Sequence, residues 1–351
     1  MEMKEFNHLK ILNHLDRIEA LDEGKKPFPV SCEIDPSNLC NHKCVWCYFA
    51  KSRKSIQENI PKKILFNVIK ELAEGGTKSI TFTGGGEPLA NPSTIDAIKL
   101  TKGSGIQCGL VTNGGLLSEN INKIIIQNCS FVRISLDAGT FETHRQLHKP
   151  KNEKNDNFNN IMKNIENLVI ERERKHKNIT IGVGFLVHKT NYMEIQALAE
   201  ILKNVNVDYL QIRPINIPGN LDYTKVWNDA QPIIERTMKL SNEKFRIFPV
   251  QRRYYEILCD IRNYTKCMIH NLLTVIGADS KVYLCSLFRG IEKYSFGSLK
   301  EKSFKEIWNG ERRKNIVETL NINKCPNCRY NGYNEILEYL SSKNKIHANF
   351  L

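Results

Sequence analysis

"PVSCEIDPSNLCNHKCVWCYF", residues 29–49, joins a short apolar strand pattern to a loop with three cysteines in a C-x₃-C-x₂-C spacing. Soft thiolate ligands suit iron–sulfur and zinc sites. A structural zinc site is closed by four protein ligands, whereas three thiolates can hold three irons of a four-iron cluster and leave the fourth iron open. The spacing therefore predicts that Cys40, Cys44 and Cys47 bind an iron–sulfur cluster. Zinc with His42 as fourth ligand stays as the alternative.

Outward from this loop, short apolar runs alternate with segments of helical periodicity. The expected strands lie at 29–35, 79–84, 107–113, 131–137, 179–188 and 207–214. Apolar residues recur at helical spacing in 62–76, 93–103, 118–128, 157–174 and 191–205. This order predicts an α/β fold whose parallel sheet has right-handed crossovers and curls into a partial (βα)6 TIM-like barrel. We expect the alternation to stop near residue 215.

Composition indicates a globular protein of the reducing cytoplasm. The chain has 351 residues, of which 41% are hydrophobic and 25% charged, and its charged N-terminal stretch is helix-patterned rather than a signal peptide. No apolar run approaches the roughly 18 residues of a membrane span. The 11 cysteines then indicate metal ligands or reactive thiols. The net charge of +13 comes from basic clusters interleaved with Glu, which we expect on solvated helix faces; the excess favours an anionic substrate over nucleic acid.

Polar residues follow the later strands at the edge where the cysteine loop lies. The run TGGGEPLANP, 83–92, combines glycines that let a backbone approach a ligand closely with Glu87, a carboxylate that can accept from an ammonium group. Thr112-Asn113-Gly114, Ser135-Leu136-Asp137 and Gln211-Ile212-Arg213-Pro214 end three more strands. Ligands bind at the carboxyl ends of parallel strands. Each of these residues could instead cap a helix or a turn.

Together these residues resemble the radical S-adenosylmethionine (SAM) superfamily over residues from about 28 to 215. The resemblance implies that Cys40, Cys44 and Cys47 bind a catalytic 4Fe-4S cluster whose open iron takes the amino and carboxylate groups of SAM. It also implies reductive cleavage of SAM to methionine and a 5′-deoxyadenosyl radical, while the protein places the reactants and excludes water.

The same resemblance implies a set of residues around SAM. The backbone after the third cysteine would meet the adenine, the glycine run the methionine amino group, and later strand ends the ribose or carboxylate. In chain order the implied cofactor-binding residues are Trp46, Tyr48, Gly84, Gly85, Gly86, Glu87, Asn113, Ser135, Asp137, Arg145, Gln211 and Arg213, with Lys149 as the alternative to Arg145.

The last third of the chain resembles the Twitch or SPASM extension of this superfamily. In that extension a cysteine, a glycine, here Gly277, and a second cysteine form a hairpin, and a later C-x₂-C completes an auxiliary cluster. No cysteine follows the C-x₂-C, so we expect one auxiliary 4Fe-4S cluster, the Twitch form, with a four-thiolate zinc ribbon as the alternative. The expected ligands are Cys267, Cys285, Cys325 and Cys328.

These expectations divide the chain into four parts. The N-terminal helical segment is 1–27, the radical SAM partial barrel 28–215, the bridging segment 216–258 and the auxiliary cluster domain 259–351.

The resemblance implies an oxidoreductase or epimerase that abstracts a hydrogen atom from a substrate carbon. Our leading hypothesis is a small sugar-like, polyol or nucleotide-linked substrate, because peptide maturases often carry a long leader-binding domain and only about 28 residues precede the first strand here. The alternatives are a ribosomal peptide maturase with a separate leader-binding protein and, on charge alone, RNA modification. We expect an electron donor such as flavodoxin or ferredoxin and no membrane partner.

Residues left over by this assignment suggest two further roles. Cys259 lies just upstream of the auxiliary ligands and is the candidate hydrogen-atom donor of an epimerase, with Cys32 and Cys108 as competing spare thiols. A buried hydrophobic role is the alternative for a free cysteine. Arg252 and Arg253 could meet a substrate phosphate.

Overall fold

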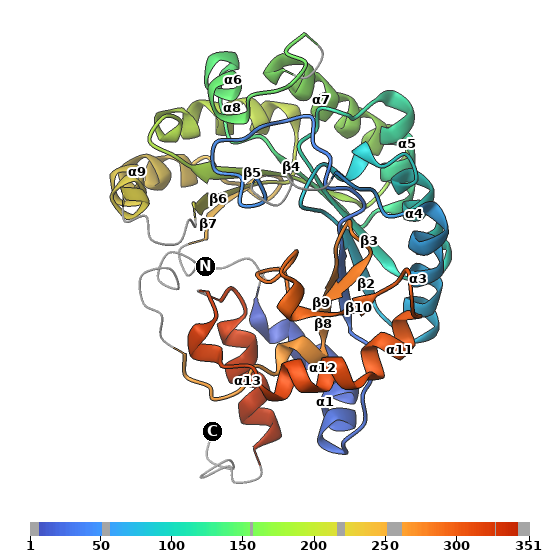
Figure 1. Ribbon diagram of the computed structural model, residues 1–351. Helices are drawn as coiled ribbons and strands as arrows, with labels where there is room; N and C mark the ends of the chain where they lie inside the picture. Colours follow the sequence, from blue (N-terminus) through green and yellow to red (C-terminus); the bar gives the residue numbers. More distant parts are fainter. Residues whose placement is uncertain are drawn as a thin grey trace.

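The computed structural model describes residues 7–50, 57–154, 157–215, 222–250, 262–326 and 328–342. Its strands form a ten-stranded sheet in the order β10-β9-β8-β1-β2-β3-β4-β5-β6-β7 (Figure 1). The strands are β1 (Ser31–Ile34), β2 (Ser79–Phe82), β3 (Gln107–Thr112), β4 (Phe131–Ser135), β5 (Thr180–Val187), β6 (Tyr209–Pro214), β7 (Arg246–Pro249), β8 (Leu273–Ile276), β9 (Lys281–Tyr283) and β10 (Ser295–Ser298). Neighbours from β8 through β7 pair in parallel, and β9 and β10 pair antiparallel. The sheet does not close, so it is a partial barrel.

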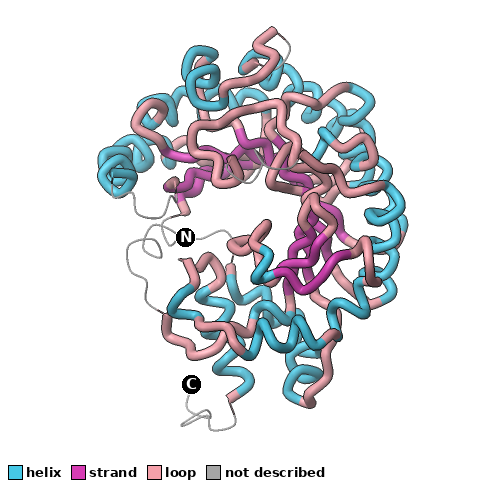
Figure 2. Tube along the Cα trace, viewed as in Figure 1, coloured by secondary structure: helices cyan, strands magenta, loops and turns pink. Residues whose placement is uncertain are grey.

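Helices cover the convex face of this curved sheet (Figures 1 and 2). They are α3 (Lys62–Glu74), α4 (Thr94–Gly103), α5 (Glu119–Asn128), α6 (Phe141–His148), α7 (Phe158–Arg174), α8 (Ile195–Val205) and α9 (Asp222–Met238). Side chains alternate between the two faces of a strand. Ile34, Ile134 and Ile212 are fully buried in the core between sheet and helices. Glu33, Arg133 and Gln211, one residue away, therefore belong to the concave face.

Local sequence explains where several helices begin. The side chains of Ser118, Thr140 and Asn157 accept a hydrogen bond from a backbone N–H in the first turn of α5, α6 and α7. Ser303 and Glu306 form a capping box at the start of α11 (Phe304–Asn309). Polar residues at these positions thus fix where each helix begins.

The N-terminal segment packs against the C-terminal region. It contains the 3-10 helix η2 (His8–His14) and α1 (Leu15–Asp22), and Ile11 and Ile18 are buried against Ile269, Leu272 and Leu337. The other helices are η3 (Pro88–Ala90), η4 (Tyr192–Glu194), η5 (Ile269–Asn271), η6 (Glu292–Tyr294), α12 (Glu311–Glu318), η7 (Ile322–Lys324) and α13 (Asn331–Ser341). Within the described ranges, none of the helices has the length and apolarity needed to cross a membrane.

The expected α/β partial barrel is confirmed, but the expected end of the alternation near residue 215 is wrong. Helix α9 and strand β7 continue it, and β7 pairs in parallel with β6. The signal was weak because α9 contains Pro232 and β7 has only four residues. Strand β8, expected in a separate domain, pairs in parallel with β1 and extends the same sheet.

Candidate functional site

The thiol loop, residues 40–47, lies after β1 and is held by the end of α6. Backbone N–H groups of Lys43 and Val45 donate to the carbonyl oxygens of His148 (2.9 Å) and Leu147 (3.0 Å). Within the loop, the N–H of Cys47 donates to the carbonyl of Cys44 at 3.2 Å. The loop after the first strand and the helix after the fourth strand therefore form one rim of the sheet.

The Cys44 thiol has a buried imidazole beside it. His148 Nδ1 lies 3.4 Å from Cys44 Sγ, and His148 Nε2 lies 3.3 Å from Asp137 Oδ2. Burial opposes ionisation of both groups, but their mutual attraction outweighs it, so the pKa of Cys44 is lowered and the pKa of His148 is raised. The thiolate is the form that binds metal. The donor set of this loop therefore fits an iron–sulfur cluster.

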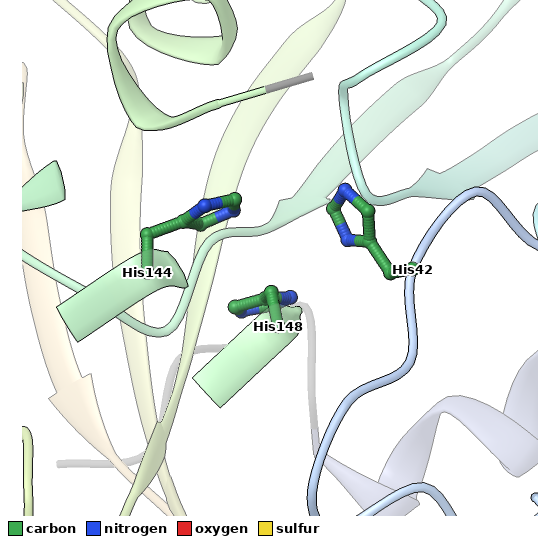
Figure 3. A group of neighbouring side chains, drawn as sticks. All are labelled: His42, His144 and His148. Atoms are coloured by element: carbon green, nitrogen blue, oxygen red, sulfur yellow. The ribbon is translucent and has the colours of Figure 1, made fainter. Parts of the chain in front are cut away.

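His148 is one of three buried histidines that lie close together (Figure 3). One ring nitrogen from each of His42, His144 and His148 lies within 4.8 Å of the other two. The sequence had singled out His42 alone; the spacing of the other two by four residues on α6 was the available signal. His148 already contacts Cys44 and Asp137, so we interpret the group as support for the thiol loop rather than a separate metal site.

The glycine run packs on the chain that enters the thiol loop. The N–H groups of Gly86 and Glu87 donate to the carbonyl oxygens of Ser37 (3.2 Å) and Leu39 (2.7 Å). A Cβ on Gly86 would lie 2.1 Å from the Leu39 oxygen, so only glycine permits this approach. Gly85 N–H donates to Asp35 Oδ2 at 3.1 Å.

Glu87 joins the glycine run to the end of β3. Its Oε1 accepts from Thr112 Oγ1 at 2.6 Å and from Leu89 N–H at 3.2 Å, and its Oε2 accepts from Asn113 N–H at 2.8 Å. Burial raises the pKa of Glu87, against these hydrogen bonds. Asn113 Nδ2 in turn donates to Asn41 Oδ1 at 2.7 Å within the thiol loop. The structure therefore brings Glu87 and Asn113 to the loop, and their contact with SAM stays a prediction.

The other residues predicted to bind SAM differ in how deeply they are buried. The Trp46 ring lies 5.6 Å from His148, whereas Tyr48 is 52% exposed. Asp137 is buried, and its Oδ1 accepts from Leu186 N–H at 2.6 Å. Arg145 is exposed on α6, with Nε 3.4 Å from Glu153 Oε2.

For the remaining residues predicted to bind SAM, the structure gives their positions in the fold. Gly84 lies beside Ser37, and Lys149 ends α6 in the left-handed conformation. Ser135 and Arg213 lie on the concave face near the ends of β4 and β6, and Gln211 lies on the same face in the middle of β6. Their roles toward SAM stay predictions.

Four cysteines gather in the C-terminal region, on both sides of β8 in the sequence. Cys267 precedes η5, Cys285 follows β9, and Cys325 and Cys328 precede α13. Burial, together with the nearby thiols of Cys285, Cys328 and Cys325, raises the pKa of Cys267 to about 12. Such crowded thiols are stabilised as thiolates only by a cation, so the set fits an iron–sulfur cluster or the alternative zinc ion.

Buried charges join these cysteines to β1. Arg289, in the loop after Cys285, lies 2.9 Å from Glu33 Oε2 and 2.8 Å from Asp35 Oδ2. Arg329, next to Cys328, also pairs with Glu33. Burial raises the pKa of Asp35 to about 7, with Arg289 opposing the shift. This network was not predictable from local sequence patterns, because its partners are more than 250 positions apart.

Two of the spare thiols face away from the concave side. Cys32 and Cys108 are buried on the helix-covered face of β1 and β3, and Cys108 Sγ lies 3.7 Å from Cys129 Sγ. They are therefore corrected from possible hydrogen donors to core residues. Cys259, Arg252 and Arg253 lie outside the described residues.

Comparison with known families matches both parts of this arrangement. Residues 34–202 match the family described as the radical SAM superfamily, and residues 267–329 match SPASM, described as an iron–sulfur cluster-binding domain. The cysteine-type anaerobic sulfatase-maturating enzyme of Clostridium novyi (strain NT) is 27% identical over 322 residues, which cover 84% of this chain and 83% of that protein. The tungsten-containing aldehyde ferredoxin oxidoreductase cofactor-modifying protein of Pyrococcus furiosus is 27% identical over 312 residues, 80% of each chain.

Solved structures share the fold. SuiB of Streptococcus suis bound to SAM superposes with a TM-score of 0.67 at 14% identity, covering 95% of this chain and 79% of that one. The protein anSMEcpe with bound SAM gives a TM-score of 0.63 at 20% identity, covering 88% of each chain. From the two matched domains, the three-thiol loop and the partial barrel, this chain belongs to the radical SAM superfamily and carries a SPASM iron–sulfur domain.

Proposed function

We propose that this radical SAM enzyme abstracts a hydrogen atom from a carbon of a substrate held on the concave face of the sheet, between the thiol loop and the four C-terminal cysteines. The observation that carries this proposal is the position of β1. Its carboxyl end leads into the thiol loop, and β8 of the cysteine-rich region pairs directly beside it. A substrate on the concave face near β1 would therefore be close to both sets of thiols.

The chain's own residues have distinct tasks in this proposal. Cys40, Cys44 and Cys47 would hold the catalytic cluster, with His148 fixing the orientation of Cys44. The cluster, when bound and reduced, supplies the electron that cleaves SAM to the 5′-deoxyadenosyl radical. Glu87 and the glycine run would orient the methionine end of SAM. A reductant such as flavodoxin or ferredoxin would deliver the electron.

Two substrate classes deserve testing. A polypeptide is the first, because the relative from Clostridium novyi, which this chain matches over both domains, is a sulfatase-maturating enzyme. A small anionic polyol or sugar is the second, because arginines lie on the concave face of β4 and β6. Dehydrogenation and epimerisation are the two candidate outcomes, and Cys259 is the proposed hydrogen donor for epimerisation.

The test is anaerobic incubation of the reconstituted enzyme with SAM, reductant and either a peptide pool or a metabolite pool in deuterated water. We expect one pool to stimulate 5′-deoxyadenosine formation and to yield a mass-shifted product. Loss of two hydrogens identifies a dehydrogenase, and uptake of one deuterium identifies an epimerase. The control is the variant in which all three thiol-loop cysteines are alanine. If the natural enzyme forms no more 5′-deoxyadenosine than this variant with any pool, the proposal is wrong.

Replacement of the proposed donor refines the result. Cys259→Ala should still form 5′-deoxyadenosine with the true substrate but should not install deuterium in the product. Normal deuterium uptake by this variant excludes Cys259 as the donor.

A further inference from the structure

Arginine side chains converge on the concave face of β4 to β6, deeper in the sheet than the thiol loop. Arg133 belongs to β4, and Gln211 and Arg213 belong to β6; β5 lies between them. The register aligns Arg133 with Gly182 of β5 and aligns Gly184 with Gln211. We call Arg133, Gln211 and Arg213 the concave-face cluster. Arg133 had not been singled out from the sequence.

The members of this cluster contact one another. Arg133 Nη1 donates to Gln211 Oε1 at 3.2 Å, and Gln211 is almost fully buried. The Nε atom of Arg133 is buried and has no hydrogen-bond partner among the residues that the structure describes. A buried guanidinium donor without an acceptor is costly, and an added oxyanion would satisfy it.

Glycine on β5 makes room for both arginines. A Cβ on Gly184 would lie 3.2 Å from Arg213 Nη2 and 3.7 Å from Arg133 Cδ. The two side chains therefore approach each other across a position that has no side chain of its own. Neighbouring like charges repel, and an anion between them would remove that repulsion.

Protein carboxylates do not neutralise Arg133 in the described part of the chain. The concave-face carboxylates of β1, Glu33 and Asp35, already pair with Arg289, and Glu33 also pairs with Arg329. By register, the concave-face positions of β4 to β6 from residue 131 onward hold aromatic, hydroxyl, amide, glycine, leucine and arginine residues and no Asp or Glu. Among the residues that the structure describes, these strand positions therefore carry positive side chains and no negative ones.

We propose that Arg133, Gln211 and Arg213 form an anion-binding site that takes an oxyanion of the substrate, either a carboxylate or a phosphate. This proposal assigns Gln211 and Arg213 to the substrate in place of their predicted contact with SAM. The guanidinium groups would bind the oxyanion through paired N–H donors. This inference rests on the proposed function, because that function places the substrate on the same face of the sheet. It assigns the substrate an acidic group that lies on the concave face of β4 to β6.

The test uses phenylglyoxal, which modifies guanidinium groups that are not bound to an anion. The reconstituted holoenzyme with SAM is treated in the presence of inorganic phosphate, malonate, or sodium chloride at matched ionic strength, and peptide mapping by mass spectrometry follows each arginine. At an anion concentration of about ten times its Kd, we expect modification of Arg133 and Arg213 to slow roughly tenfold. Arg236, exposed on α9, is the control and should react at the same rate in every arm.

Variants check that the cluster acts as a unit. Arg133→Gln should raise the Kd for phosphate, measured by protection of Arg213, about tenfold or more, and Arg133→Lys should restore part of the loss. Iron content and SAM affinity are measured on each variant to exclude misfolding. If Arg133→Gln does not fold, the protection pattern of the natural protein decides the question.

The outcomes separate the sources of the oxyanion. Protection by phosphate alone indicates a phosphorylated substrate, and protection by malonate alone indicates a carboxylate such as that of an acidic peptide. Protection by neither anion at tens of millimolar, or equal slowing at Arg236, overturns the proposal. Formation of 5′-deoxyadenosine is measured on the same preparation. Its absence counts against the proposed function and leaves the protection result to judge the anion site by itself.

Discussion

Replacement of Glu87 by Gln tests the connection between the glycine run and the end of β3. The Gln side chain can keep the Oε1 contacts with Thr112 Oγ1 and Leu89 N–H, but it places an amide NH₂ where Oε2 accepts from Asn113 N–H. A hydrogen bond to a charged acceptor contributes about 1.5–3 kcal/mol. Because burial raises the pKa of Glu87, removing this buried charge offsets part of the loss. We therefore expect a cost of about 1–2 kcal/mol, or roughly a 5- to 30-fold increase in local opening.

Hydrogen exchange in the reconstituted enzyme measures this cost at the Asn113 amide. Glu194→Gln is the matched control, because Glu194 also accepts from one backbone N–H, that of Gly139 at 2.7 Å, and from the hydroxyl of Thr143 at 2.6 Å. It should increase exchange at Gly139 and leave Asn113 unchanged. Glu87→Gln should also weaken SAM binding with the iron content intact. Unchanged exchange at Asn113 together with unchanged SAM affinity would refute the reasoning.

Three further measurements address the clusters, the sheet and the histidines. Seven ligand cysteines imply two four-iron clusters, or about eight irons per chain. Replacing the three thiol-loop cysteines by alanine should remove about half of this iron. Zinc together with only about four irons would contradict the assignment of an iron–sulfur cluster to the four C-terminal cysteines. Gly182→Ala should lower the free energy of unfolding, measured by denaturant titration, by about 1–3 kcal/mol, because its Cβ would lie 2.0 Å from the Tyr209 ring. Gly103→Ala, with open space around it, should not lower it, and equal changes in the two variants would contradict this. Burial lowers the pKa of His144 to about 2, so the folded protein binds fewer protons than the unfolded chain below pH 6.5. The free energy of unfolding should therefore fall by about 2 kcal/mol by about pH 5. His144→Phe should remove this loss in denaturation curves, and parallel pH curves for the two proteins would count against it.

Local patterns in the sequence determined the order of the elements and the thiol loop. Strands β1 to β6 and helices α3, α4, α5, α7 and α8 follow from apolar periodicity, because burying one face of each element requires that spacing. Helix α6, which carries His144 and His148, was not predicted. The C-x₃-C-x₂-C loop needed no tertiary information, because its ligands lie within eight residues. The glycine run was also visible as a close-approach site, although the partner that requires Gly86, the carbonyl of Leu39, was not.

Tertiary structure alone decided which distant residues meet. The pairing of β8 with β1, the ion pairs of Arg289 and Arg329 with Glu33, and the contact of His148 with Cys44 join segments more than 100 positions apart. Sequence periodicity reports which face of an element is apolar, but not which element lies opposite its polar face. The concave-face cluster was hidden for the same reason, since Arg133 and Gln211 become neighbours only when β5, with glycine between them, sets the register of β4 and β6.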